Sequence, residues 1–361
     1  MQWNPDKGAR TGGYEGTPHR GGRPLLVLYH QDFLLHDPTP IYHPENPERL
    51  ALATASLRAI MDITWREPEP ENAKKVYAAV HDEHYINLIY DVAERAVEPA
   101  WIDADTYVVK GTITALERLA GAATEAVELL LAGRDAFILG RPPGHHAGRR
   151  GRALGAPTLG FCIFNTSALV SKMLSEKGRV AVLDFDLHHG NGTQDILWDE
   201  DIIHIDIHQD PSTIYPGTGF PWQSGGVRGT KINVIVPPGS GDDIYREAVA
   251  YAFDLIRDYD PDYLVVSAGF DAYQGDYAGM KATRYTYSLI GTFVNRLDVP
   301  VAIVLEGGYE AGLREGLPAF VASVTRGHSL GEPVTASGKW QWERFRYWTE
   351  RLREELEGRR G

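Results

Sequence analysis

The stretch VLDFDLHHGNGTQD, residues 182–195, begins like a buried strand and continues as a polar loop. Asp184 and Asp186 alternate with apolar residues, and His188 and His189 follow directly. Packing alone gives a sheet no reason to hold carboxylates and imidazoles here, because buried polar groups cost free energy unless they are paired. The pattern therefore predicts a strand whose carboxyl end carries a functional site.

Similar short apolar runs recur along the chain, at residues 24–30, 135–140, 179–186, 201–208, 231–236, 263–269 and 300–308. Helical patterns lie between several of them, for example over 113–133 and 243–260. Continuous apolar strands that alternate with helices are typical of a mainly parallel sheet covered on both faces. We therefore expect a single large α/β domain.

Composition narrows the classes of protein to which the chain can belong. The formal net charge of −13 among 361 residues argues against nucleic acid as the main partner. No apolar run is long enough to span a bilayer, and the N-terminal residues lack the apolar segment of a signal peptide. The only cysteine, Cys162, rules out a disulfide framework within the chain and is expected to be a buried packing residue. We expect a cytoplasmic protein.

Three parts are expected along the chain. Residues 1–23 are rich in Gly and Arg without periodicity and indicate a tail or a surface arm. Residues 24–335 form the predicted domain. Residues 336–361 include a charged amphipathic pattern, which predicts a helix whose aromatic residues pack on that domain.

The polar chemistry of the sequence is concentrated after the predicted strands. The segments that follow them read RPPGHHAG, FDLHHGNGT, IHQDPSTIYPGTG, PPGSGDD, GFDAYQGD and EGGYE. Loops at the carboxyl ends of parallel strands converge and form the ligand site of open α/β sheets. Six of the 13 histidines lie between residues 145 and 208, often next to aspartates. Together these clusters indicate a metal site.

Asp186, His188 and Asp271 are the predicted metal ligands. Asp186 and His188 are two residues apart at a strand end, so both side chains point to one side. Asp271 follows another strand. Two carboxylates and one imidazole leave a position open for water or substrate, as in catalytic sites. Zinc is the first choice, and Fe(II), Co(II) or Mn(II) would accept the same ligands. If Asp186 and His188 only capped a strand, the accompanying clusters would have no explanation.

The motifs RPPGHHA, DFDLHHGNGTQ, YPGTG, AGFDA and EGGY, with an earlier HPENPERL, resemble those of the histone deacetylase family in order and spacing. This family includes acetylpolyamine amidohydrolases and acetoin-utilisation proteins, and the resemblance, closest to the class II and bacterial branches, covers about Leu25 to Gly327. It implies an arginase-like α/β fold. It also implies a zinc-dependent deacetylase that removes an acetyl or another acyl group from a primary-amine amide, such as acetyl-lysine or an acetylpolyamine.

The resemblance also implies residue roles. It assigns zinc to Asp186, His188 and Asp271, and proton transfer to His145 and His146. Asp184 would orient His145, and Asn191 would orient His146. An amide stabilises an imidazolium less than a carboxylate does, so the two histidines should differ in basicity. Which of them is the general base remains open.

Further positions follow from the same resemblance. Tyr309 would donate a hydrogen bond to the substrate carbonyl and its developing oxyanion. Gly160, Phe161 and Tyr215 would line a narrow channel for an aliphatic stem. A structural monovalent cation, K⁺ in our expectation, would bind at Asp184, Asp186, His188, Asp206 and Ile207.

The chain departs from the family pattern in the loop after Asp271. Relatives commonly read DAH followed by DPLG, whereas Tyr273 and Tyr277 occupy the His and Pro positions here. This loop is therefore expected to fit a different acyl group or amine.

The rim of the channel is predicted to be acidic and to favour a cationic substrate. His208 and Asp210 are expected at a loop rim, with Asp37 and Glu45 adding negative charge there. The negative net charge of the chain would help such a substrate to approach.

Two other functions would use parts of the same set of motifs. A binuclear manganese ureohydrolase of the same fold would need a second aspartate two residues after Asp271, where Tyr273 stands. A catalytically silent protein that binds an acylated ligand would not need His145, His146 and Tyr309 together. A dinucleotide site is excluded because PPGSGDD lacks the GxGxxG continuation. The acyl length and the oligomeric state are left open.

Overall fold

The computed structural model describes residues 22–327 and 331–358. Its centre is an eight-stranded sheet in the order β2-β1-β5-β10-β9-β6-β7-β8, and all neighbouring strands are parallel. The strands span Ile63–Arg66 (β2), Leu25–Leu28 (β1), Asp135–Ile138 (β5), Val301–Leu305 (β10), Tyr263–Ala268 (β9), Val180–Asp184 (β6), Ile203–Gln209 (β7) and Lys231–Val236 (β8). The parallel α/β fold expected from the sequence is confirmed.

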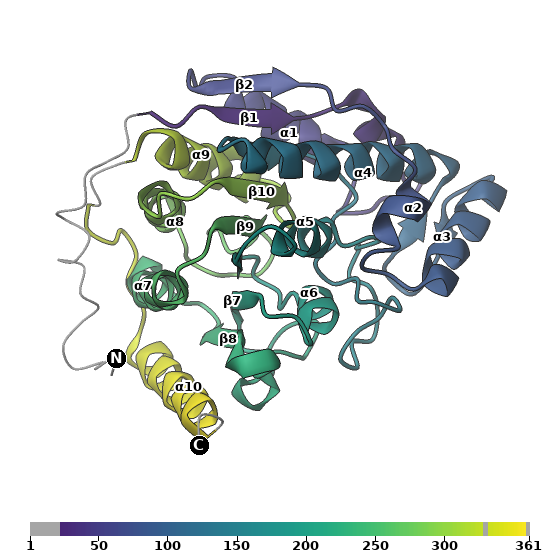
Figure 1. Ribbon diagram of the computed structural model, residues 1–361. Coiled ribbons are helices and arrows are strands. Elements are labelled where there is room, and N and C mark those ends of the chain that lie inside the picture. The colour runs from purple at the N-terminus through teal and green to yellow at the C-terminus, as the bar shows by residue number, and fades with distance from the viewer. Residues whose placement is uncertain (1–21, 328–330, 359–361) are drawn as a thin grey trace.

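Helices cover both faces of this sheet, with α7, α8 and α9 on one side of the strands and α4, α5 and α6 on the other (Figure 1). The helices span Glu48–Leu57 (α1), Ala73–Tyr77 (α2), Glu83–Arg95 (α3), Lys110–Leu131 (α4), Thr166–Ser175 (α5), Asn191–Leu197 (α6), Asp242–Tyr259 (α7), Arg284–Arg296 (α8), Leu317–Arg326 (α9) and Lys339–Gly358 (α10). Every residue of β1, β6, β8 and β10 is buried. Burial on both faces explains why the strands read as continuous apolar runs.

The C-terminal helix α10 packs beside β8, the edge strand of the sheet. Phe345, Trp348 and Leu352 are its buried apolar residues. The arm predicted over residues 1–23 lies almost entirely outside the described residues.

Three strands of the structure were not predicted from the sequence. β2 forms one edge of the main sheet, and only Ile63 of its four residues is buried, so the segment lacks a continuous apolar run. β3 (Ala100–Trp101) and β4 (Tyr107–Val108) form a small antiparallel ribbon whose strands are too short to leave a pattern.

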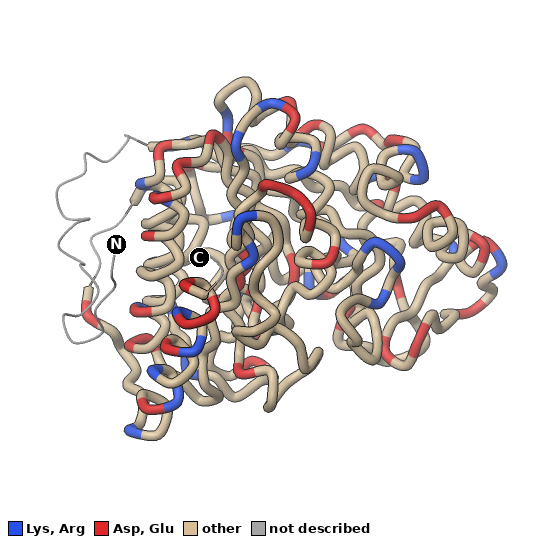
Figure 2. The backbone as a smooth tube through the Cα atoms, turned by 60° about the horizontal axis from the view of Figure 1, so that its bottom comes forward, with Lys and Arg blue, Asp and Glu red and all other residues tan. Residues whose placement is uncertain are grey.

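Basic residues are interspersed with acidic ones over much of the molecule (Figure 2). Within the described ranges, no helix is both long enough and apolar enough to cross a bilayer.

Candidate active site

The loops that follow β5, β6, β9 and β10 bring most of the predicted site residues together. These four strands are adjacent in the order β5-β10-β9-β6, so their carboxyl ends lie along one edge of the sheet. His145 and His146 follow β5, Asp186 and His188 follow β6, Asp271 follows β9, and Tyr309 follows β10.

Asp186, His188 and Asp271 form a compact cluster of potential metal ligands. His188 Nδ1 lies 3.1 Å from Asp186 Oδ1 and 2.9 Å from Asp271 Oδ2. Ligand atoms about 2.0–2.1 Å from one tetrahedral ion stand about 3.3 Å apart, so these separations suit a shared ion. The other carboxylate oxygens are held by the backbone, because Gly307 N–H donates to Asp186 Oδ2 at 2.8 Å and Leu187 N–H to Asp271 Oδ1 at 3.0 Å.

Two further observations fit a cation at this cluster. Asp271 Oδ2 is buried and accepts no well-aligned hydrogen bond from any described residue, although His188 Nδ1 is near. Burial alone would lower the pKa of His188, but Asp186 and Asp271 raise it to about 10. The two carboxylates thus favour positive charge between them, and a divalent ion supplies it better than a proton. The residues present fit zinc or a similar divalent metal.

His145 and His146 lie side by side behind this cluster and have different partners. His145 Nδ1 is 3.1 Å from Asp184 Oδ2, and His146 Nδ1 is 2.8 Å from Asn191 Oδ1. Asn191 Nδ2 donates to the Ala153 carbonyl at 2.9 Å, which leaves Oδ1 as the acceptor for His146. In the neutral ring the proton therefore resides on Nδ1 of His146, and Nε2 carries the free lone pair.

The charges around the two histidines give them opposite pKa shifts. Burial lowers the pKa of His145, but Asp186 and Asp184 raise it well above its ordinary value. Burial lowers the pKa of His146, and the charges of His145 and His188 lower it further. The expected difference in basicity is therefore present, and His146 is the neutral member of the pair.

A second buried acidic cluster lies next to the first, where Asp184 and Asp206 pair across β6 and β7. His208 Nδ1 contacts Asp206 Oδ1 at 2.6 Å, and His208 Nε2 contacts the Gly219 carbonyl at 3.0 Å. His204 is fully buried, and neither of its ring nitrogens has a hydrogen-bond partner among the described residues. The structure thus places Asp184 and Asp206 of the expected K⁺ site together, and the cation itself remains a prediction.

The loop that carries Tyr309 is fixed from two sides. Arg49 donates from Nε to the Gly308 carbonyl at 2.8 Å, and its guanidinium lies 4.9 Å from the centre of the Tyr309 ring. Asp276 Oδ2 accepts from the backbone N–H of Tyr309 at 3.2 Å. Burial raises the pKa of Tyr309 well above its ordinary value, so its hydroxyl keeps the proton that an oxyanion donor needs. Sequence reasoning missed Arg49 and Asp276, although HPENPERL and GFDAYQGD contain them.

Phe161 and Tyr215, the predicted channel walls, lie beside the cluster. The Phe161 ring meets Tyr309 at 6.2 Å, and the Tyr215 ring meets His146 at 5.0 Å. Tyr215 donates its hydroxyl proton to the Thr158 carbonyl at 2.9 Å, so its apolar face remains for a substrate. Gly160 has a positive φ of 54°, and a Cβ there would stand 2.6 Å from the His146 ring. Only glycine fits at position 160, between the rings of His146 and Tyr215.

A cavity of about 300 Å³ opens at this site. Its lining residues include three of the predicted site, His188, Asp271 and Tyr309, and the others are Gln209, Thr213, Ile214, Tyr277 and Ala278. Tyr277 is 62% exposed, and its ring lies 5.4 Å from that of Tyr309. Tyr273 instead stacks on Tyr287 and does not line the cavity.

The prediction that Glu45, His208 and Asp210 lie at an exposed rim was wrong, because all three are buried. Glu45 is fully buried and bound by Arg141, with both Nε–Oε1 and Nη2–Oε2 at 2.6 Å. Asp210 is 1% exposed, and its Oδ2 accepts from Arg344 at 2.9 Å and Trp348 at 2.7 Å. His208 is buried as well, and half-buried Asp37 accepts from Thr39.

Asp103 and Asp105 contact the segment that precedes Phe161, one of the predicted channel walls. Asp103 Oδ2 accepts from Leu159 N–H at 2.7 Å, and Asp105 Oδ2 accepts from the Thr158 hydroxyl at 2.6 Å. Both carboxylates therefore support the loop that leads into Phe161.

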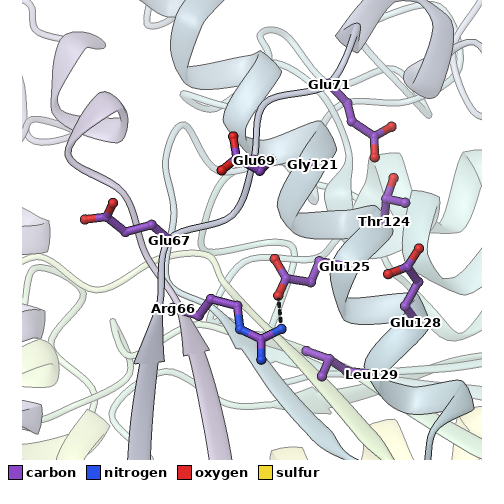
Figure 3. Close-up of a pocket in the computed structure, with 9 residues that line it drawn as sticks. All are labelled: Arg66, Glu67, Glu69, Glu71, Gly121, Thr124, Glu125, Glu128 and Leu129. Atoms are coloured by element: carbon purple, nitrogen blue, oxygen red, sulfur yellow. Dashed lines mark hydrogen bonds and ion pairs between the residues drawn. The ribbon is translucent and has the colours of Figure 1, made fainter.

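A separate acidic cavity of about 510 Å³ lies between the segment after β2 and α4 (Figure 3). Glu67, Glu69, Glu71, Glu125 and Glu128 line it, and Arg66 pairs with Glu125 at 2.6 Å. None of the predicted site residues lines this cavity.

Comparison with known proteins agrees with this geometry. Residues 43–326 match the histone deacetylase domain. The chain is 34% identical to a probable deacetylase of Methanothermobacter thermautotrophicus over 79% of its own length and 86% of the relative. It is 33% identical to an acetylpolyamine amidohydrolase of Burkholderia pseudomallei over 79% of its own length and 94% of the relative.

Among solved structures, the HD domain of HDA15 matches with a TM-score of 0.78 and 26% identity, covering 93% of this chain and 96% of that one. The chain belongs to the histone deacetylase domain family, which is a family of hydrolases. It is an amide-hydrolysing enzyme of this family, with a candidate metal centre at Asp186, His188 and Asp271.

Proposed function

We propose that the chain is a zinc-dependent deacetylase that hydrolyses the acyl amide of a primary amine, such as acetyl-lysine or an acetylpolyamine. The observation that carries the proposal is the convergence of Asp186 Oδ1, His188 Nδ1 and Asp271 Oδ2 beside a pair of histidines with opposite pKa shifts. Two relatives bear the names deacetylase and acetylpolyamine amidohydrolase, which supports this class of substrate.

The side chains divide the proposed reaction between them. The divalent ion, when bound, acts as a Lewis acid that polarises the amide carbonyl and makes a water more acidic. Neutral His146 accepts the proton of the attacking water at Nε2, while Asn191 holds its Nδ1–H. His145 keeps its positive charge against Asp184 and favours the negative charge that develops on the substrate.

Tyr309 and the channel walls complete the proposed mechanism. The Tyr309 hydroxyl donates to the carbonyl oxygen as it becomes an oxyanion. Phe161 and Tyr215 hold the aliphatic stem of the amine between apolar faces and exclude water from it. The departing amine then takes a proton from the Nε2–H of His146.

The decisive experiment measures turnover and metal content in the same preparation. Acetyl-lysine peptides and monoacetylated diamines are assayed before chelation, after chelation and after zinc is restored. We expect one divalent ion per active chain and turnover that follows it. Two ions per active chain would favour a binuclear ureohydrolase, and tight binding without turnover would favour a silent binding protein.

A further inference from the structure

Glu306 is a fully buried carboxylate beside the active site, and the mechanism above gives it no role. It is the residue that follows β10, and it begins the EGGYE segment that also contains Tyr309. All hydrogen bonds that its carboxylate accepts come from neutral groups, namely two backbone N–H groups and one hydroxyl. A buried carboxylate costs free energy unless it is well hydrogen-bonded, so these partners indicate what it does.

Both N–H groups belong to the turn that carries the two histidines. Gly144 N–H donates to Glu306 Oε2 at 2.8 Å, and His145 N–H donates to the same oxygen at 3.2 Å. The other oxygen, Oε1, accepts from the Ser167 hydroxyl at 3.2 Å. β5 and β10 are neighbours in the sheet, so the end of β10 lies against the loop that follows β5. A single side chain therefore holds two successive peptide groups of that loop.

The turn depends on side-chain contacts because its own backbone offers no alternative. Among the described residues, the N–H groups of Gly144, His145 and His146 donate to no backbone carbonyl. Buried N–H groups are nearly always paired. His146 N–H donates to Cys162 Sγ at 3.4 Å, and sulfur is a weak acceptor. Glu306 is thus the strongest anchor of the three amides.

This anchor lies at the opposite end of the histidine side chains from Asp184 and Asn191. Those two residues contact the rings at Nδ1, whereas Glu306 holds the backbone from which the rings project. The centres of the His145 and His146 rings are 4.0 Å apart, so a shift of one ring displaces the other. A misplacement of about 1 Å can lower a rate about a hundredfold. Both ends of the pair must therefore be fixed.

We propose that Glu306 is a positioning residue, whose carboxylate holds the backbone of Gly144 and His145 and thereby sets the place of the His145–His146 pair beside the metal cluster. It acts through the two histidines and does not contact the substrate. The inference rests on the deacetylase function proposed above and adds a residue from β10 to its proton-transfer machinery.

Two substitutions separate the position of the acceptor from its charge. Glu306→Asp keeps a carboxylate but is shorter by one C–C bond, about 1.5 Å, so its oxygens are withdrawn from the two amides. Glu306→Gln keeps the length and an acceptor oxygen but loses the charge. We expect kcat for a monoacetylated diamine to fall by about tenfold to a hundredfold in Glu306→Asp and by no more than about threefold in Glu306→Gln. KM should stay near the wild-type value in both. Glu306→Ala, which removes the acceptor, serves if Glu306→Asp does not fold.

Hydrogen–deuterium exchange measures the anchor itself and needs no turnover. A peptide that contains residues 144–146 should exchange faster in Glu306→Asp than in the wild type or Glu306→Gln, because its amides open more easily without an acceptor. Elemental analysis of the same preparations should show equal metal content, so that loss of metal does not account for slower turnover.

Asp135 provides a matched control on the same two strands. It begins β5, is 4% exposed, and accepts from the N–H of Val301, the first residue of β10, at 3.0 Å. It also pairs with Arg23, so Asp135→Ala should lower the melting temperature. Its contacts lie at the opposite ends of the strands from the histidine pair. Asp135→Ala should therefore leave kcat unchanged at a temperature where it is folded.

A kcat in Glu306→Asp equal to that of the wild type would overturn the inference. So would a kcat in Glu306→Gln as low as that in Glu306→Asp, because the charge would then be what matters. An equal loss of kcat in Asp135→Ala would also overturn it, because the effect would then reflect general destabilisation. Each of these outcomes leaves the deacetylase proposal standing, because the wild type is active. If the wild type hydrolyses no acylated amine with any divalent metal, the proposed function fails, and the exchange measurement alone decides whether Glu306 holds the turn.

Discussion

Asp276 anchors the loop of Tyr309 through one carboxylate oxygen. Asp276 Oδ2 accepts from the backbone N–H of Tyr309 at 3.2 Å, and also from those of Glu310 at 3.2 Å and Gly312 at 3.1 Å. The two residues come from the loops after β9 and β10, which are neighbouring strands. The position of the proposed oxyanion donor therefore depends on the loop that also carries Asp271.

Removing the hydroxyl of Tyr309 should separate chemistry from binding. We expect Tyr309→Phe to retain its metal and its melting temperature but to lose about a hundredfold or more in kcat, as when one oxyanion donor is removed. Steady-state kinetics with a monoacetylated diamine, together with elemental analysis, measure this. A rate equal to the wild type would show that Tyr309 has no role in the transition state.

Asp276→Ala should lower kcat by about tenfold to a hundredfold, because a misplaced catalytic group loses much of its effect. If Asp276 acts through Tyr309, its loss adds little once the hydroxyl is gone. The double variant Asp276→Ala/Tyr309→Phe should then be about as slow as Tyr309→Phe alone. Independent, multiplying effects in this cycle would contradict a positioning role for Asp276.

The central strands could be predicted from the sequence because they are buried on both faces. Val180–Asp184 and Val301–Leu305 are wholly buried, and each is a nearly unbroken apolar run. The edge strand Ile63–Arg66 was missed because three of its four residues are exposed. A strand of this kind depends on its partner β1, and a local pattern does not show that partner.

Site residues could be predicted where they lie close together in the sequence. The prediction failed for rim residues whose burial depends on partners that are distant in the sequence. Asp186 and His188 lie two residues apart, and the structure brings Asp271 to them. Asp210 and Glu45 were placed at a rim although both are buried, because their partners Arg344 and Arg141 lie 134 and 96 residues further along the chain. A charged residue considered alone is expected to be exposed. The burial of Asp210 and Glu45 depends on an arginine that is distant in the sequence, and a local pattern does not show it.

Metal removal should destabilise the protein as well as inactivate it. Without an ion, the carboxylates of Asp186 and Asp271 are left close together in a buried site. A ligand present at a thousandfold excess over its Kd stabilises the folded state by about 4 kcal/mol. We therefore expect a higher melting temperature when zinc is added to chelated protein.

Matched variants identify the residues responsible for this zinc effect. Asp271→Asn should reduce the zinc-dependent rise in melting temperature, whereas Asp276→Ala should keep it, because Asp276 is not among the predicted ligands. A rise of the same size in wild type and Asp271→Asn would place the zinc elsewhere. Thermal scans with and without zinc provide both measurements.

Glu45 should contribute to stability in a manner that depends on pH. It is fully buried and paired with Arg141 and Arg49, and its Oε2 also lies 3.3 Å from His36 Nε2. Burial alone would raise the pKa of Glu45, but Arg141 and His36 hold it well below its ordinary value. A carboxyl with a depressed pKa stabilises the fold above its unfolded pKa of about 4.3, and this contribution falls as pH drops below that value.

Glu45→Gln leaves the buried guanidinium of Arg141 without its counter-charge. We expect the free energy of unfolding at pH 7 to fall by about 3–5 kcal/mol, the cost of breaking a buried ion pair from one side. The difference from wild type should shrink as pH falls below about 5, because the Glu45 carboxyl of the unfolded chain then takes up a proton while that of the folded protein stays ionised. Glu67→Gln is the control, since Glu67 is 78% exposed and should change stability by no more than about 0.5 kcal/mol. Urea unfolding of the wild type and the two variants across this pH range measures the free energy of unfolding. If the loss of stability in Glu45→Gln does not vary with pH, the ionised carboxylate is not what stabilises the fold.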